Sequence, residues 1–245
     1  MIWLGIALIG LCIGFLSGLF GKGGSAIATP LLHAIGVPAI IAVAAPLPAT
    51  IPSTLAAFNV YRKGNYLNYR VLKLSLIFGI PATIVGSIAT CWIGGDFLVL
   101  TTDVIVALLG LRFLLAKKQT QNTGVVEISD WKIILVSIVV GLVSGLLANS
   151  GGFLLAPLYI AILKLPIKSA FATSLAVASV LAVPGTIVHT VLGHIDWKIV
   201  LVFGSMSIPF ANIGARTAVK IDAHKLEKIF GIVLLILGVT FIFLH

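Results

Sequence analysis

Long apolar segments separated by short polar turns fill almost the whole chain. Each half contains five of them, at about 2–20, 24–36, 39–60, 72–93 and 97–116, and at about 132–148, 152–163, 167–189, 198–218 and 226–244. A bilayer core about 30 Å thick needs about 20 apolar residues per crossing helix. The pattern therefore predicts an all-α, polytopic membrane protein in which the second segment of each half is too short to cross fully.

The two halves repeat one pattern of small residues and prolines. Gly14, Ser17, Gly18, Gly24 and Pro30 recur as Gly141, Ser144, Gly145, Gly151 and Pro157 at one constant offset. Pro38, Pro81, Gly86 and Gly110 recur as Pro166, Pro209, Gly214 and Gly238 at an offset one residue larger. We expect a first transmembrane repeat at 1–118, a polar linker at 119–130 and a second transmembrane repeat at 131–245.

Positive charges predict the topology, because Lys and Arg gather in cytoplasmic loops. If all ten segments cross, 15 of the 16 Lys and Arg residues lie on one side and only Lys198 lies on the other. If the two short segments instead enter the membrane and return to the same side, the Lys and Arg residues divide 9 to 7 between the two sides, which indicates no orientation. We therefore expect ten crossings with both termini outside. A repeat of five crossings inverts the second copy, so the fold is an inverted-topology repeat.

Composition excludes several classes of function. The chain is 60% hydrophobic and 9% charged, far from the roughly 25% charged residues of a soluble domain. Its net charge of +9 fits cytoplasmic loops, and no nucleic-acid-binding motif accompanies it. Cys12 and Cys91 fall in apolar runs and are expected to be buried packing residues. No catalytic set, metal motif or cofactor motif is present, so we expect neither an enzyme nor a bound metal or cofactor.

A glycine-rich break precedes each short segment, at Gly23-Gly24-Ser25 and at Ser150-Gly151-Gly152. Paired breaks at matching places in two halves are typical of a transporter's binding site. The start of a helix presents unpaired N–H groups and positive partial charge, and glycine lets an anion come close. Lys22, Thr29 and Asn149 add donors beside them. The alternative is close helix packing through small residues.

Further candidates lie on the third segments. Pro46, Thr50 and Ser53 follow one another in the first half, and Thr173 and Ser174 occupy the corresponding part of the second. Their hydroxyls line a substrate pathway or, alternatively, satisfy backbone groups freed by kinks.

One carboxylate lies well inside an apolar segment. Asp103 is a candidate proton carrier, or else an acidic residue at the outer membrane interface. His189 lies near the end of a long segment and is expected to be a hydrogen-bonded packing residue.

These motifs together resemble the TauE/SafE family of sulfite exporters. The resemblance rests on Ser17–Gly24 with Pro30-Leu31-Leu32, on Ser144-Gly145 with Gly151-Gly152-Phe153, and on Ala170–Leu175 and Gly193–Trp197. It covers essentially the whole chain. It implies transport of sulfite, thiosulfate, sulfonates or related sulfur-containing anions across the bacterial inner membrane. The chain departs from the family pattern at Lys22, at Asn149-Ser150 and at Ala45-Pro46, which leaves the substrate open.

The leading hypothesis is a secondary transporter that moves a small sulfur-containing anion across the inner membrane by alternating access. A carrier for another small anion, such as a carboxylate, is the first alternative. An anion channel or a structural membrane subunit is the second. The expected partners are the anion and membrane lipid, without nucleic acid. The direction of transport, the coupling ion and the formation of a homo-oligomer are left open.

Overall fold

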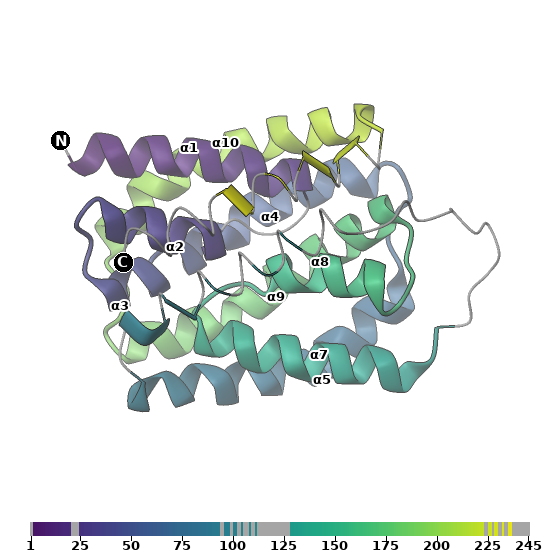
Figure 1. Cartoon of the computed structure of the whole chain (residues 1–245), viewed down its shortest axis with the longest axis horizontal. Coiled ribbons are helices and arrows are strands. Elements are labelled where there is room, and N and C mark those ends of the chain that lie inside the picture. The colour runs from purple at the N-terminus through teal and green to yellow at the C-terminus, as the bar shows by residue number, and fades with distance from the viewer. Residues whose placement is uncertain are drawn as a thin grey trace.

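A computed structural model of the chain describes most of the molecule. The described residues are 2–20, 25–93, 96–98, 100–101, 104, 108, 111, 128–222, 225–226, 228–229, 232 and 235–236. The elements assigned in these residues are helices, which confirms the predicted all-α class (Figure 1). The named helices are α1 (Ile2–Phe20), α2 (Ser25–Ala34), α3 (Ala39–Ala44), α4 (Pro46–Arg62), α5 (Tyr69–Ala89), η1 (Thr90–Trp92), α7 (Asp130–Leu146), α8 (Gly152–Ala161), α9 (Ile167–Val191) and α10 (Trp197–Lys220).

The described chain contains five helical stretches long and apolar enough to cross a membrane. They are α1, α3 with α4, α5 with η1, α9 and α10. The short second segments appear as α2 and α8, with 10 residues each. Most of the predicted segments 97–116 and 226–244 falls outside the described residues. Helix α5 begins three residues before the predicted segment because Asn68 caps it, its side chain accepting a hydrogen bond from the N–H of Val71.

Helix boundaries in the two halves match at the offsets seen in the sequence. Helices α2 and α8 begin at Ser25 and Gly152, while α5 and α10 begin at Tyr69 and Trp197. The extra residue of the second half lies in the turn after α8. There Lys164 has a φ of 57°, where the first half places Gly36 with a φ of 94°.

Glycines hold together two pairs of helices from different halves. Along α1, Gly10, Gly14 and Gly18 contact Phe203, Ser207 and Ala211 of α10 in turn. The corresponding residues of the other pair meet in the same way, because Gly141 and Gly145 of α7 contact Gly79 and Thr83 of α5. Small residues let the two backbones approach closely, which drives helix packing in lipid. Each half therefore packs its first helix on the fourth helix of the other half.

The order of these contacts fixes the helix directions. Helix α10 is parallel to α1, and also to α4, since Gly204 lies by Ala49 and Asn212 donates to the carbonyl of Ala56. Helix α5 is likewise parallel to α7 and α9.

The two groups of three run in opposite directions. Leu47 near the start of α4 contacts Gly185 late in α9, whereas Asn68 beyond α4 donates to the hydroxyl of Thr173 early in α9. In Figure 1, accordingly, the chain enters α1 and α7 at opposite sides of the molecule.

The outer surface of the bundle is suited to lipid. Large apolar side chains such as Leu8, Val85 and Leu201 are more than half exposed on the long helices. Cys12 and Cys91 are also exposed and unpaired, so their predicted burial is wrong. Both lie on outward-facing sides of helices, where a small apolar side chain contacts lipid as readily as protein. The chain is an integral membrane protein.

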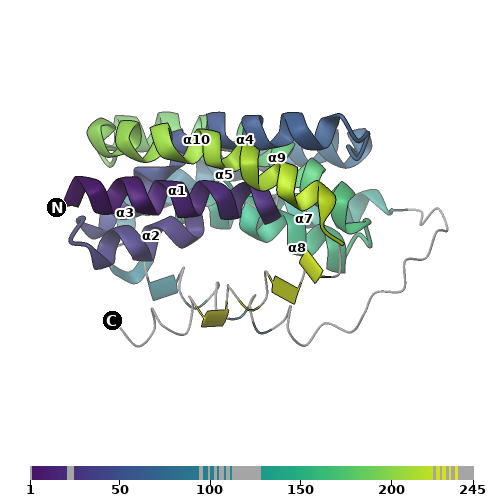
Figure 2. The ribbon, with the colours of Figure 1, turned by 90° about the horizontal axis from the view of Figure 1, so that it is seen from above.

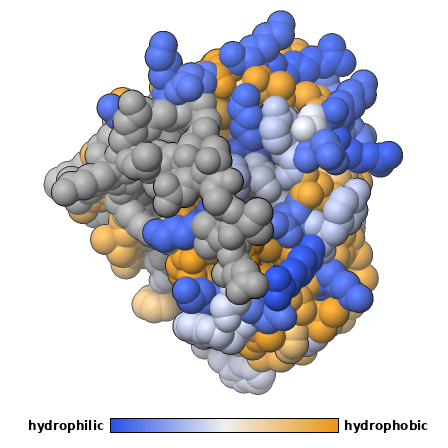
Figure 3. Space-filling view, turned by 90° about the vertical axis from the view of Figure 1, so that its right-hand side faces the viewer, coloured by the Kyte–Doolittle hydropathy of each residue, from blue (hydrophilic) through white to orange (hydrophobic). Residues whose placement is uncertain are grey.

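Basic residues gather at one end of the helices. They lie within about two turns of the end of α4, the start of α5, the start of α7, the start of α9 or the end of α10. The residues are Arg62, Lys63, Arg70, Lys73, Lys132, Lys164, Lys168, Arg216 and Lys220. Figure 3 views this end, where hydrophilic residues are interspersed with apolar ones. An ion pair of 2.8 Å between Arg70 and Asp130 joins α5 to α7 there.

Candidate functional site

The second break begins where α7 ends. The N–H of Asn149 donates to the carbonyl of Ser144 at 2.8 Å, and the N–H of Ala148 donates to that of Gly145 at 3.2 Å. This is a Schellman motif, which requires a left-handed residue just past the helix. Ala148 takes that conformation with a φ of 44°. The first half has Gly21 at the corresponding position, the residue that adopts it without strain.

Asn149 then turns the chain toward α8. Its side-chain oxygen accepts a hydrogen bond of 2.8 Å from the N–H of Gly151, which has a left-handed φ of 73°. This bond fixes the orientation of the amide, so the other atom is the NH₂ group. That nitrogen is buried and has no hydrogen-bond partner among the described residues. A buried donor without a partner costs free energy, so its position needs a reason such as a ligand.

A second donor without a described partner lies against the same break. The hydroxyl of Ser144 is also buried and unpartnered within the described ranges. It lies against the break, because a Cβ added at Gly151 would be 2.5 Å from the Ser144 Oγ. Ser17 occupies the corresponding position of the first half, and its hydroxyl is also buried and without a hydrogen-bond partner among the described residues. The sequence pattern contained both serines, but the prediction used them only as markers of the repeat.

Helix α8 begins inside the protein. Ser150, Gly151, Gly152 and Phe153 are all buried. The carbonyl of Gly151 accepts the N–H groups of Leu154 and Leu155, as expected of a helix N-cap. The N–H groups of the first turn have no partner within their own helix, and they carry the positive end of the helix dipole. The buried start of α8 therefore combines N–H groups with the two side-chain donors of Asn149 and Ser144.

The first break falls largely outside the described residues. Lys22, Gly23 and Gly24 are not described, and Ser25 is described only as the first residue of α2. Thr29, one turn further along α2, is buried. By the repeat offset, Lys22 corresponds to Asn149, so each break has one residue with side-chain N–H donors at the same position.

The third helix of the first half is divided at Ala45, so α3 ends before Pro46 and α4 begins with it. The hydroxyls of α4 bond to their own helix. Thr50 donates to the carbonyl of Leu47 at 2.7 Å, and Ser53 is 2.9 Å from that of Ala49. Because a hydroxyl has a single proton, these donors are engaged in this conformation. A substrate role for Pro46, Thr50 and Ser53 stays a prediction.

Thr173 and Ser174 lie at a different level of the packed helices α4 and α9. Ser174 donates to the carbonyl of Phe171, and the hydroxyl of Thr173 accepts the N–H of Asn68. Thr173 is about 18 Å along α9 from Gly185, where the start of α4 packs, at 1.5 Å per residue. The structure thus places the hydroxyls of Thr173 and Ser174 far along α9 from the start of α4, where Pro46 lies. Asp103, the predicted proton carrier, lies outside the described residues.

Two residues that were not predicted as site residues contact the ends of α1 and α7, the helices that precede the two breaks. The Tyr61 hydroxyl is 3.4 Å from the carbonyl of Gly18, and the His189 Nε2 is 3.3 Å from that of Gly145. Tyr61 corresponds to His189, and Gly18 corresponds to Gly145, at the two repeat offsets. His189 is buried and hydrogen-bonded, as predicted. Comparing the halves position by position pairs Tyr61 with His189, but the contacts themselves needed the structure.

A buried chain of hydroxyls distinguishes the second half. The Ser75 hydroxyl is 2.6 Å from that of Tyr159 and 3.0 Å from that of Ser137, linking α5, α8 and α7. The corresponding residues of the other half are Phe203, Leu32 and Gly10. The two halves are therefore alike in fold but not in polarity.

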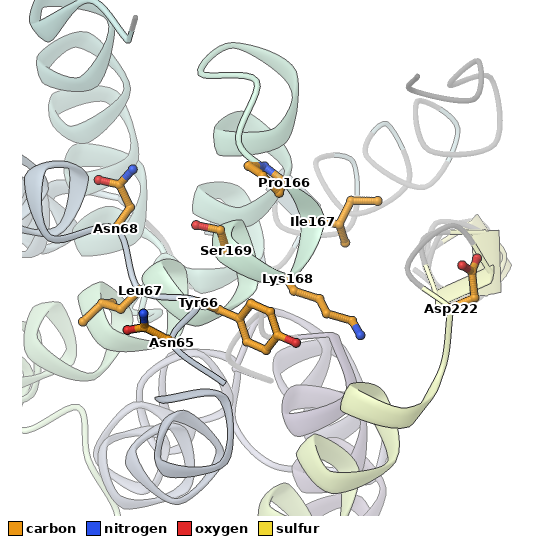
Figure 4. Close-up of a pocket in the computed structure, with 9 residues that line it drawn as sticks. All are labelled: Asn65, Tyr66, Leu67, Asn68, Pro166, Ile167, Lys168, Ser169 and Asp222. Carbon is orange, nitrogen blue, oxygen red and sulfur yellow. The ribbon is translucent and has the colours of Figure 1, made fainter. Parts of the chain in front are cut away.

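A surface cavity of about 440 Å³ lies at the basic end, between the α4–α5 turn and the start of α9 (Figure 4). The Lys168 amine donates to the carbonyl of Val219 at 3.1 Å and lies 5.9 Å from the centre of the Tyr66 ring. A lysine at this place neutralises the negative end of the α10 dipole. The cavity is not lined by any of the predicted substrate-binding residues. Its lining is Asn65, Tyr66, Leu67, Asn68, Pro166, Ile167, Lys168, Ser169 and Asp222.

Among the described residues, no group of three His, Cys, Asp or Glu side chains could hold a metal ion. The chemistry of the breaks is that of hydrogen-bond donors and partial positive charge, which suits a small anion.

Comparison with known proteins agrees with this chemistry. The family model for the sulfite exporter TauE/SafE matches residues 6–241. The chain belongs to the TauE/SafE family. The resemblance drawn from the glycine motifs is confirmed over nearly the whole chain. The family is one of transporters, which is consistent with a protein that is not an enzyme.

Similar proteins are named as probable membrane transporters. A probable membrane transporter protein of Xylella fastidiosa (strain 9a5c) is 27% identical over 235 residues, covering 93% of this chain and 90% of the relative. The probable membrane transporter protein YjnA of Bacillus subtilis (strain 168) is 26% identical over 251 residues, covering 97% and 98%. No solved structure matches the chain.

Proposed function

We propose that this TauE/SafE protein is a secondary transporter that moves a small sulfur-containing anion, such as sulfite, thiosulfate or an organosulfonate, by alternating access. The observation that carries the proposal is the Asn149 NH₂ group, buried without a described partner beside the buried start of α8. An anion held there would satisfy this donor, the Ser144 hydroxyl and the first N–H groups of α8 together. The family supplies the class of anion.

The two short helices support a single central site. In Figures 1 and 2, α2 and α8 lie roughly in line along the long axis of the molecule, with their N-terminal ends toward the middle. Each has 10 residues and is about 15 Å long at 1.5 Å per residue. Two such half-helices together match a hydrocarbon core about 30 Å thick. An anion between them would contact Lys22 from one side and Asn149 from the other.

Opposed helix directions support an inverted-topology repeat. The group of α1, α4 and α10 is antiparallel to the group of α7, α9 and α5, and corresponding residues make corresponding contacts in both. Rocking of one group against the other around a central site would expose the site to each side of the membrane in turn.

The basic end of the bundle supports the proposed orientation. Lysines and arginines at the ends of α4 and α10 and at the starts of α5, α7 and α9 mark that end as cytoplasmic. Both chain termini would then lie outside, and in a bacterium the membrane would be the inner one.

Transport by the purified protein in proteoliposomes tests the function. Sulfite, thiosulfate, taurine and sulfoacetate would be compared with simple carboxylates, and counterflow would be measured for each. We expect saturable counterflow of at least one sulfur-containing anion. Counterflow of carboxylates alone would favour the other carrier, while non-saturating flux would favour a channel.

Asn149→Asp then tests the site, because it keeps the oxygen that accepts the Gly151 N–H but replaces the donor by a second oxygen. We expect at least about tenfold weaker anion affinity, which is about 1.4 kcal/mol. Asn68→Asp is the matched control, since Asn68 also accepts a backbone N–H through its side chain, at the start of α5. Equal affinities of the two variants would reject Asn149 as a ligand.

A further inference from the structure

In each half, a side chain of the third helix contacts the end of the helix that precedes the break. The two side chains differ in chemical type. In the first half, the Tyr61 hydroxyl lies 3.4 Å from the carbonyl of Gly18 and 3.3 Å from that of Leu19, near the end of α1. In the second half, His189 donates to the carbonyl of Gly145 at the corresponding position. A tyrosine hydroxyl does not titrate in the physiological range, whereas a histidine does.

A second histidine completes the contact in the second half. The Nδ1 atoms of His189 and His194 are 3.2 Å apart, and their ring centres are 5.4 Å apart. A Schellman motif at the end of α9 brings them together, because the N–H of His194 donates to the carbonyl of His189 and Gly193 is left-handed with a φ of 72°. The first half has Tyr66 at the position of His194.

The hydrogen bonds fix where the protons lie. A carbonyl only accepts, so His189 carries its proton on Nε2, and in the neutral ring Nδ1 is then an acceptor. His194 must donate from Nδ1, which leaves its Nε2 free to take a proton from water. If that proton binds and the shared proton moves to His189 Nδ1, His194 is neutral again and His189 becomes an imidazolium.

The described surroundings of His189 do not stabilise a positive charge on its ring. His189 is fully buried, and none of the titratable side chains on the adjoining elements is hydrogen-bonded to either histidine in the described part of the chain. Those side chains are Cys91, Asp96, Asp196 and Lys198. Asp196 instead accepts the N–H groups of Lys198 and Ile199 as the N-cap of α10.

A buried imidazolium without a carboxylate is costly, so protonation favours any conformation in which the ring reaches water. Burial also lowers the pKa of His194, so the neutral pair is the form that fits this conformation.

We propose that the histidine pair, His189 and His194, is a proton-binding site that controls the second break. When the pair is neutral, it holds the end of α9 against the end of α7. When it binds a proton, the two ends separate and the Ala148–Gly151 turn loosens, while the Tyr61 contact of the first break is unchanged. The proposal rests on the proposed function only in taking the second break as the anion site, and it would make transport of the anion depend on protons.

Hydrogen exchange of the purified full-length protein tests the proposal without any substrate. Exchange would be measured at pH 7.5 and pH 5.5 and corrected for the intrinsic effect of pH. In the wild type, we expect residues 142–152 to exchange about tenfold faster at the lower pH, with less than a twofold change at residues 12–20 beside the Tyr61 contact. No difference between the two regions would overturn the proposal.

Three variants complete the experiment. His189→Gln keeps an N–H donor but cannot titrate, His189→Tyr copies the first half, and His194→Gln removes the entry point of the proton. Each variant that folds should lose the pH response of residues 142–152. An undiminished response in His194→Gln and in either His189 variant would also overturn the proposal. A transporter that binds no sulfur-containing anion could still show the response, so the two proposals fail separately.

Discussion

Ser207 of α10 packs directly on Gly14 of α1, so closely that a Cβ added at Gly14 would lie 2.5 Å from the Ser207 Cα. The same contact recurs in the other half, where a Cβ at Gly141 would lie 2.7 Å from the carbonyl oxygen of Gly79. These contacts join the two halves, so the glycines at these positions set how closely α1 packs on α10 and α7 on α5.

Gly14→Ala and Gly141→Ala should each destabilise the protein by about 1–3 kcal/mol, because the partner is backbone and the helices must move apart. Gly204→Ala is the control, since its Cβ would meet only the Ala49 Cβ at an ordinary 3.4 Å. There, replacing a glycine inside a helix should cost nothing or stabilise by up to about 1 kcal/mol. Thermal unfolding in detergent measures the difference, and equal effects at all three positions would contradict it.

Tyr159→Phe should destabilise the protein by about 1–3 kcal/mol, because it removes the hydrogen-bond partner that the buried Ser75 hydroxyl has on α8. Ser75→Ala in the same background should cost less than it does alone, since the two side chains share one hydrogen bond. Tyr69→Phe is the matched control, because Tyr69 is 70% exposed. A double-mutant cycle with additive effects would show that the hydroxyl chain is not coupled.

Acid should destabilise the protein through His194. Burial lowers its pKa in the folded state below the ordinary value of about 6.5. Above about pH 6.5 the ring is neutral in both states, so its contribution is complete. Below that pH the unfolded state binds more protons, so stability falls as the pH falls. The melting temperature should therefore drop more between pH 7.5 and pH 5.5 in the wild type than in His194→Gln.

Cysteine labelling tests the topology. Single cysteines would be placed at Asn122 in the linker and at His245 at the C-terminus, in a background where Cys12 and Cys91 are replaced by alanine. A membrane-impermeant reagent added to intact cells should modify the cysteine at position 245 and leave that at position 122 unmodified. Modification of both from the same side would contradict five crossings in the second repeat.

Much of the fold could be predicted from the sequence because apolar length and repeated glycines report on physical constraints that act locally. The segments 2–20 and 39–60 match α1 and the α3–α4 pair within two residues, and the short segments are α2 and α8. The exposure of Cys12 could not be predicted, because an apolar run does not say which face of a helix meets lipid.

The site could be predicted only in part. The sequence placed a break before Gly152, and Asn149 and Ser150 were candidates because they border it. The unpartnered Asn149 nitrogen depends on which amide atom faces the Gly151 N–H, which needs coordinates. The contacts of Tyr61 and His189 depend on the end of one helix meeting another helix more than 40 residues away.

Equilibrium binding of thiosulfate to the purified protein tests whether both breaks form one anion site. A single shared site predicts one anion per chain, with an affinity weakened by Lys22→Met and by Asn149→Asp, and unchanged by Lys117→Met at the end of the first repeat. Two anions per chain, each sensitive to only one of the first two substitutions, would contradict it.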